Sequence, residues 1–374
     1  MSSRFAEKLY MALPSEGNLF FSPFSVAAAL GRAATGARGE TRREILEVLV
    51  LSDLGDFELM RQITEQEAAV LAAPGITIEA ANKLYLEADF GFRGEFLQLM
   101  RHFQAGIEMV DFRNASSAVI DRINDWVAQQ THGRIKDILA PGSLDEETRM
   151  ALVNAVYFKA AWQYAYAEEL THRTVFHQAL QETAPVWMMH QETNRFRYWE
   201  DGQLQILGVP YQGQRLWRLY ILPRIGVSLR KVEERVAREG ILPIFDSLWT
   251  HRNVQVYVPK FEMGWGTFDI TSQLIEMGIR AAFSDNADFF GMVEDGEAGL
   301  YLSNAFHKAW VEDNELGSEA AAATVLVAKE LCASPNHKPQ SIVFRADWPF
   351  MFGIVDSETE EILFLGRMTD PTVS

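Results

Sequence analysis

The chain has 374 residues, of which 48% are hydrophobic, and its 24 Phe and 9 Trp are ample for a large buried core. Its 51 Asp and Glu outnumber its 34 Lys and Arg, which gives a net charge of −17 at pH 7. This acidity, together with the lack of any long run of basic residues, argues against nucleic acid, heparin-like polyanions and anionic membranes as partners.

Signals for export and for disulfide bonding are not evident. The first ten residues carry charges where a signal peptide has its apolar stretch, and no uncharged apolar run approaches the roughly 20 residues of a membrane span. The single cysteine, Cys332, excludes an internal disulfide. We therefore expect no membrane span, and either a cytoplasmic protein or a secreted one whose signal has been removed. The missing bridges favour a microbial or intracellular origin.

Hydrophobic periodicity predicts helices and strands in the first part of the chain. Ser25 is expected to cap the second helix. A nearly continuous apolar run over residues 150–158 is typical of a central strand that is buried on both faces. The predicted helices cover residues 5–13, 26–34, 42–49, 56–71, 92–103 and 115–132, and the predicted strands cover 76–86 and 107–112.

Strand signals dominate the second part of the chain. They are dense between residues 174 and 222 and return at 253–259 and 302–311, with helices predicted at 227–239 and 271–277. No internal repeat, low-complexity tract or change of composition marks a boundary. We therefore expect a single domain over residues 1–374 that contains several sheets.

The stretch from Glu315 to Cys332 has conflicting local preferences. Ser318 and the alanine-rich residues after it resemble the capped start of a helix, whereas the β-branched residues from Thr324 onwards suit a strand. Gly317 permits backbone angles that other residues resist. One interpretation is an ordinary surface helix. The other is a segment that changes conformation, which is favoured by the strand signal before it and the proline-containing loop after it.

Sequence motifs of catalysis are not found. No Gly-x-Ser-x-Gly elbow, phosphate-binding Gly-Lys-Ser/Thr loop or His-Glu-x-x-His zinc motif occurs, and the segment from Gly264 lacks the third glycine of a dinucleotide fingerprint. We therefore expect no cofactor, no metal ion and no catalytic residue. A catalytic triad that is assembled only in space stays open as an alternative.

Short segments spread over the chain resemble those of one family, in the same order. They include Asn-Leu-Phe-Phe-Ser-Pro-Phe-Ser at 18–25, Leu-Val-Asn-Ala-Val-Tyr-Phe-Lys-Ala-Ala-Trp at 152–162, and Glu-x-Gly-Ser-Glu-Ala-Ala-Ala-Ala-Thr at 315–324. Further matching segments lie at 258–261, 277–283, 287–289, 306–309, 344–350 and 364–367. The family is the serpins, the serine protease inhibitors, and the resemblance spans residues 4–371.

This resemblance implies an α+β serpin fold with three β-sheets, eight or nine helices and an exposed reactive-centre loop at about 315–340. It also implies a suicide-substrate mechanism, in which a protease attacks the loop and forms an acyl-enzyme, and the freed loop then inserts as a new strand of the central sheet. About fifteen inserted residues at roughly 3.3 Å each span on the order of 50 Å. The resemblance assigns the hinge of this movement to Glu315, Gly317, Ser318, Glu319, Ala320, Ala321, Ala322, Ala323 and Thr324.

The family's spacing from the hinge puts the reactive bond at Leu331–Cys332. Leu331 suits the apolar pocket of chymotrypsin-like serine proteases, which we expect as partners in a covalent complex. A second register, at Lys329, would instead give a trypsin target, and the long stretch after Cys332 leaves both open. Cys332 is expected to be an exposed small residue, and the alternative is a thiol whose oxidation blocks inhibition.

The resemblance also assigns residues beneath the central sheet. Ser22, Ser25, Asn154 and His307 are expected to form a polar cluster, the shutter, where the strands separate, and Trp162 is expected to mark the breach where insertion begins. The segment that matches the family's polyanion-binding helix has only one base, so no heparin-like cofactor is implied. We expect a monomeric inhibitor. The alternatives are a non-inhibitory serpin that is merely cleaved and serves in binding or storage, and an unrecognised hydrolase.

Overall fold

A computed structural model of the chain describes residues 3–178, 182–193, 195–250, 253–297, 299–318 and 341–373. Glu315, Gly317 and Ser318 of the predicted hinge are among them. The remaining hinge residues, the predicted reactive bond at Leu331–Cys332 and the alternative at Lys329 lie outside the described residues.

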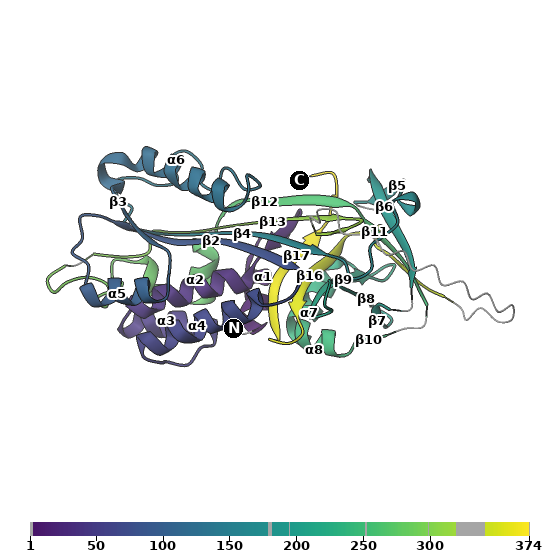
Figure 1. Cartoon of the computed structure of the whole chain (residues 1–374), viewed down its shortest axis with the longest axis horizontal. Coiled ribbons are helices and arrows are strands. Elements are labelled where there is room, and N and C mark those ends of the chain that lie inside the picture. The colour runs from purple at the N-terminus through teal and green to yellow at the C-terminus, as the bar shows by residue number, and fades with distance from the viewer. Residues whose placement is uncertain are drawn as a thin grey trace.

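Nine α-helices occur in the described part of the chain, and most of them flank one long sheet (Figure 1). Helices α2 to α5 lie on one side of this sheet, and α6 crosses its other side. The helices are α1 (Ser3–Ala12), α2 (Pro23–Gly36), α3 (Gly39–Leu49), α4 (Asp56–Leu71), α5 (Gly94–His102), α6 (Phe112–Gln130), α7 (Leu229–Glu239), α8 (Ile241–Asp246) and α9 (Thr271–Met277).

Three β-sheets are formed within the described ranges. The six-stranded sheet has the order β12 (Phe261–Asp269), β13 (Asn304–Asn314), β14 (Gly317–Ser318), β4 (Met150–Ala161), β2 (Ile76–Glu87) and β3 (Ile107–Val110). The seven-stranded sheet has the order β1 (Leu19–Phe21), β17 (Glu361–Met368), β16 (Phe350–Asp356), β9 (Leu216–Pro223), β8 (Leu204–Pro210), β7 (Arg197–Glu200) and β10 (Trp249–Thr250). The four-stranded sheet has the order β15 (Ile342–Arg345), β11 (Val254–Pro259), β6 (Thr183–Thr193) and β5 (His172–His177).

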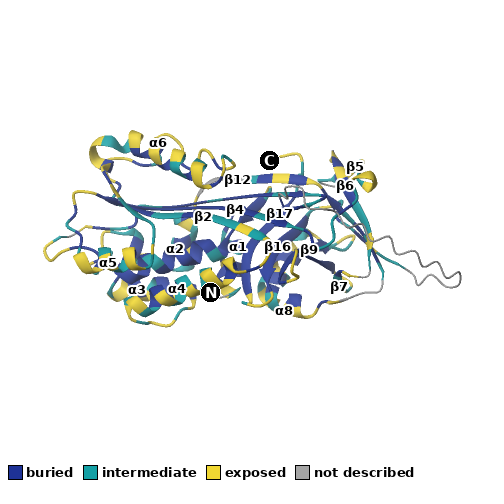
Figure 2. Cartoon of the chain, viewed as in Figure 1, coloured by how far each residue is buried: buried dark blue, intermediate teal, exposed yellow. Residues whose placement is uncertain are grey.

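Strand β4 is the centre of the six-stranded sheet, and it is buried along nearly its whole length (Figure 2). Val153, Ala155 and Tyr157 join the core under α6, whereas Val156 and Phe158 join the core shared with the seven-stranded sheet. Because successive side chains of a strand point to opposite faces, a strand covered on both faces has to be apolar throughout. The prediction from the run at 150–158 is therefore confirmed.

The start of α2 differs from the prediction. Ser22, and not Ser25, is the N-cap: its side chain accepts the backbone N–H of Ser25, and Pro23 occupies the first helical turn. Proline suits that position because the N–H it lacks would have no partner inside the helix. The helix therefore begins three residues before the predicted start at residue 26, and Ser25 becomes free to use its hydroxyl elsewhere.

Other predicted boundaries also move by a few residues, and two examples show how. The strand predicted at 107–112 ends at Val110, because Asp111 caps α6 and the carboxylate of Glu87 accepts the N–H of Phe112 at 2.9 Å. The helix predicted at 92–103 begins only at Gly94. The predicted helices at 56–71 and 271–277 have the observed bounds of α4 and α9.

Candidate functional site

Strand β14 lies between β13 and β4 at one end of the six-stranded sheet and is antiparallel to both. Ser318 pairs with Asp313 on one side and Ala160 on the other. A methyl group on Gly317 would lie 2.1 Å from the carbonyl oxygen of Ala160, so only glycine allows the strands to approach this closely. The start of the predicted hinge is thus already a strand of this sheet. Beyond β14, β13 pairs directly with β4, in parallel.

Trp162 holds the turn that precedes β14. Its indole Nε1–H donates to the carbonyl oxygen of Asn314 at 2.9 Å, and its backbone N–H donates to the carbonyl oxygen of Leu316 at 2.9 Å. The indole is buried and stacks on Tyr211, with ring centroids 4.6 Å apart. The structure therefore puts the predicted breach residue in direct contact with the root of the predicted hinge.

Glu315, in the same turn, forms an ion pair with Lys260, whose Nζ lies 2.8 Å from the carboxylate. Burial opposes ionisation of this carboxyl, but the hydrogen bonds to the carboxylate, first among them that of Lys260, together with the charge of Lys260 outweigh burial and lower the pKa of Glu315. The carbonyl oxygen of Glu315 also accepts the N–H of Tyr166 at 2.8 Å. The residue is therefore fixed through both its side chain and its backbone.

Ser318 meets a buried charge. Its hydroxyl donates to Asp313 Oδ1 at 2.8 Å and is hydrogen-bonded to the hydroxyl of Tyr211 at 2.8 Å. Asp313 forms an ion pair with Arg218 of β9 and accepts the hydroxyl of Tyr220 at 3.0 Å. Neither Asp313 nor Arg218 exposes any surface to solvent. Sequence reasoning missed this group, because an acidic residue in a strand gives no sign of a basic partner far away in the chain.

The four predicted shutter residues lie together beneath the six-stranded sheet. His307 of β13 faces Asn154 of β4 and hydrogen-bonds to it, and Asn154 Nδ2 donates to Ser25 Oγ at 2.6 Å. The backbone N–H of Ser22 donates to His307 Nε2 at 3.0 Å. Asn82 of β2, which the sequence did not single out, is a fifth member, since its Oδ1 accepts from both Asn154 and Ser25.

These contacts fix the protonation of His307. Because Nε2 accepts the N–H of Ser22, the proton must be on Nδ1, from which it is donated to Asn154 Oδ1. The imidazole is buried, and desolvation lowers the pKa of His307 to about 3. The ring is therefore neutral at physiological pH, and a protonated ring would lose the bond from Ser22.

The family of the chain follows from its sequence. The family model described as serpin (serine protease inhibitor) matches residues 1–371, nearly the whole chain. The chain belongs to the serpin family. The resemblance seen in the sequence is thereby confirmed.

Individual serpins show how far the similarity extends. Leukocyte elastase inhibitor of the pig, Sus scrofa, is 34% identical over 385 residues, which cover 99% of this chain and 98% of the relative. The solved structure of Serpin48, described as a highly specific serpin of the insect Tenebrio molitor, is 30% identical, with a TM-score of 0.85 over 98% of this chain and 96% of that one. Human thyroxine-binding globulin in complex with thyroxine is 29% identical, with a TM-score of 0.85 over 99% and 97% of the two chains. The predicted α+β serpin fold is confirmed.

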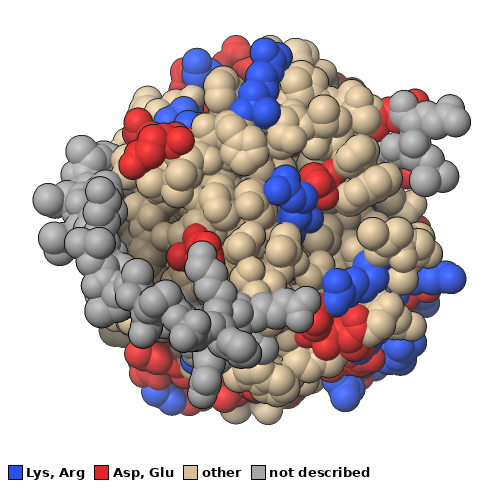
Figure 3. Space-filling model, turned by 90° about the vertical axis from the view of Figure 1, so that its right-hand side faces the viewer, with Lys and Arg blue, Asp and Glu red and all other residues tan. Residues whose placement is uncertain are grey.

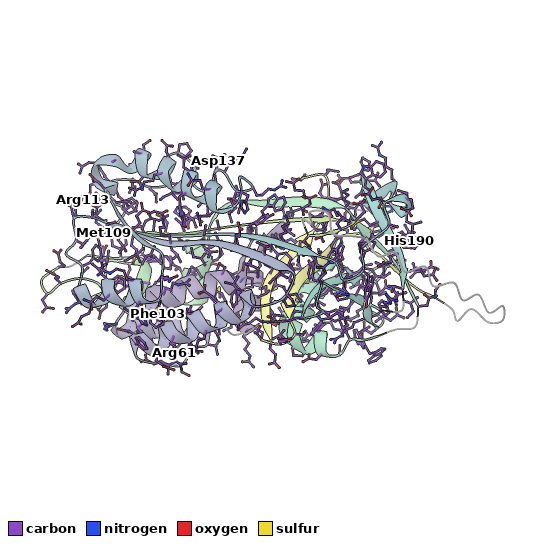
Figure 4. The ribbon with its side chains drawn as sticks, viewed as in Figure 1. Arg61, Phe103, Met109, Arg113, Asp137 and His190 are labelled. Atoms are coloured by element: carbon purple, nitrogen blue, oxygen red, sulfur yellow. The ribbon has the colours of Figure 1, made fainter. Side chains whose placement is uncertain are left out.

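The surface of this serpin mixes both signs of charge. Arg61 lies on α4, far along the molecule from His190 of β6 (Figure 4), and it is paired with Glu58 and with Glu65, the latter at 2.7 Å. At the opposite end of the molecule, Lys and Arg alternate with Asp and Glu on a mostly uncharged surface (Figure 3). No helix in the described ranges is long and apolar enough to cross a membrane. Nor do three or more His, Cys, Asp or Glu side chains of the described part gather as ligands for a metal ion.

Proposed function

We propose that this serpin is a monomeric, single-domain inhibitor of chymotrypsin-like serine proteases, and that it acts as a suicide substrate and not as an enzyme. The observation that carries the proposal is β14, a two-residue strand that already pairs on both sides at the point where β13 and β4 come together. If the hinge residues after Ser318 continued this strand, they would extend it between the same two neighbours, β13 and β4.

The register of β14 supports this continuation. The sixth residue after Ser318 is Thr324, and the same distance back along β4 and β13 leads to Asn154 and His307. Those two residues now face each other across the parallel pairing of β13 with β4. Thr324 would enter between His307 and Asn154 and break their hydrogen bond. Its hydroxyl would then give these side chains a new hydrogen-bond partner. The shutter would thus keep polar partners in both states.

The residues between Ser318 and Thr324 also suit insertion. Side chains alternate along a strand, so Ala320 and Ala322 would share the inward face with Ser318. Their methyl groups are small enough to enter a packed core without the strain that larger side chains would cause. Glu319 would point the other way. No bulky or charged residue would therefore need to enter the core on this part of the path.

Insertion also improves the pairing of the sheet. The β13–β4 ladder has seven register pairs, all parallel. A continued β14 would replace this one parallel ladder with two antiparallel ladders, and antiparallel pairing is slightly more stable per residue. This gain supports a native form that is metastable until the loop is cut.

The predicted reactive bond supports a chymotrypsin-like target. Leu331 would fill an apolar primary pocket, whereas cleavage at Lys329 would require a trypsin-like one. The family description, serine protease inhibitor, and the relative named leukocyte elastase inhibitor support a serine protease as partner. The same fold also occurs in a protein solved with thyroxine bound, which keeps a non-inhibitory binding role as the alternative.

Mixing the protein with chymotrypsin tests the proposal. We expect a complex that survives denaturing electrophoresis, and Leu331→Arg should transfer complex formation from chymotrypsin to trypsin. If both proteases produce only clipped protein, the non-inhibitory alternative holds. If trypsin forms the complex with the unaltered protein, the reactive bond lies at Lys329. Turnover of a peptide substrate without added protease would indicate a hydrolase.

A further inference from the structure

The ion pair of Arg218 and Asp313 is unusual in its setting. It joins the seven-stranded sheet to the six-stranded sheet, and neither side chain has any exposed surface. Moving two charges out of water is unfavourable unless nearly every donor and acceptor finds a partner. Among the described residues, Arg218 Nε and Nη1 have no hydrogen-bond partner. A contribution to the free energy of folding therefore does not by itself explain why the chain has this buried pair.

The position of the pair suggests another account. Asp313 is the β13 residue opposite Ser318, and its carboxylate accepts the Ser318 hydroxyl. A hydrogen bond to a carboxylate is stronger than one between neutral groups, and burial strengthens it further. If β14 left the sheet, Asp313 would lose this donor. The buried charge therefore favours every state in which Ser318 stays between β13 and β4.

We propose that Asp313, oriented by Arg218, is a positioning residue that holds Ser318 in the sheet, so that loop insertion starts from a strand that has already begun. This inference rests on the proposed inhibitory function. The acyl-enzyme either inserts its loop and is trapped, or is hydrolysed and released as clipped inhibitor. If Ser318 were not already paired with β13 and β4, this pairing would have to form before the loop could insert. Insertion would then be slower, and a larger fraction of the acyl-enzyme would be hydrolysed.

Substitutions at Ser318 separate this role from packing. Ser318→Ala removes the hydroxyl but leaves the ion pair and the strand backbone intact, whereas Ser318→Thr keeps a hydroxyl. Asp313→Asn removes the charge that accepts the hydroxyl. Asp356→Asn is the matched control, because Asp356 is also fully buried in an ion pair, with Arg215 Nε at 2.9 Å, and the hydrogen bonds that its carboxylate accepts within the described residues come from Arg215, Glu358 and Thr359 and not from β14.

The experiment measures the stoichiometry of inhibition of chymotrypsin, the ratio of covalent complex to clipped product, and the melting temperature of each variant. We expect at least a twofold rise in stoichiometry for Ser318→Ala and Asp313→Asn and none for Ser318→Thr. Asp356→Asn should melt lower without a change in stoichiometry. The inference is wrong, and the proposed function stands, if the unaltered protein forms the complex and Ser318→Ala and Asp313→Asn give the same ratio of complex to clipped product as the unaltered protein. The same conclusion follows if their ratio does not differ from that of Asp356→Asn. If the unaltered protein forms no complex, both are wrong.

Discussion

Acidification should weaken the closed sheet through His307. In the native protein this ring is neutral and accepts the N–H of Ser22, and burial holds its pKa at about 3, below the ordinary value of 6.5. Between these two values the unfolded chain binds a proton that the native protein does not. The contribution of His307 to the stability of the native protein is therefore fully present above about pH 6.5 and is lost as the pH falls towards 3.

The size of this effect follows from the two pKa values. One pKa unit corresponds to about 1.4 kcal/mol, so lowering the pH from 7 to 5 should cost about 2 kcal/mol through His307 alone. Carboxylates also gain protons in this range, so the pH slope of the unaltered protein is not sufficient evidence. His307→Gln, which keeps an acceptor for Ser22 but does not titrate, isolates the contribution of the ring.

The assay is the denaturant midpoint of the first unfolding transition, measured from pH 7.5 to pH 4.5. We expect His307→Gln to be less stable at pH 7.5 but to lose about 2 kcal/mol less than the unaltered protein by pH 5. Parallel pH profiles would refute the assignment of a buried neutral ring. His307→Ala, which deletes both hydrogen bonds, should lower the temperature of spontaneous insertion or polymerisation, and an unchanged thermal profile would count against a role in closure.

Three other outcomes are expected. Gly317→Ala should raise the stoichiometry of inhibition and cost about 1–3 kcal/mol, because the new methyl group would overlap the carbonyl oxygen of Ala160, whereas Gly55→Ala meets no atom within 4 Å and should leave inhibition unchanged. Protein nicked after Leu331 should melt higher than intact protein, and an equal or lower melting temperature would contradict a metastable native form. Peroxide treatment should leave the stoichiometry unchanged if Cys332 is only a small exposed residue, and a loss of inhibition would instead support a redox role.

Local sequence patterns predicted the elements whose burial is continuous, as in β4, or regularly periodic, as in α4. The apolar run at 150–158 indicated β4 because both faces of that strand are covered, and the periodicity of residues 56–71 gave the bounds of α4. Capping was less predictable. Ser22 and Ser25 are both good caps by residue type, and the choice between them depends on Pro23 and on the contacts of α2 with the sheet.

The polar groups at the site were harder to predict. Ser22, Ser25, Asn154 and His307 were assigned together only because they match a family, since they come from three separate parts of the chain. Their fifth partner, Asn82, is an ordinary polar residue in an alternating strand until β2 is placed beside β4. The pair of Arg218 and Asp313 joins residues of two different sheets. Such pairs depend on how sheets pack, which local periodicity does not encode.

The two faces of the β13–β4 pairing explain how one sheet can be both firmly closed and able to open. On the face under α6, Trp310 and Tyr157 stack with centroids 5.6 Å apart, and their separation would cost buried aromatic contact. On the opposite face, His307 meets Asn154 through a hydrogen bond that a new strand can replace, two residues along from the small side chain of Ala309. The loss of this aromatic contact therefore opposes separation of β13 and β4 when no strand is inserting. On the polar face, an inserting strand can replace the hydrogen bond that it breaks. A sheet that was apolar on both faces would resist separation of its strands, but it would offer an inserting strand no hydrogen bond to replace.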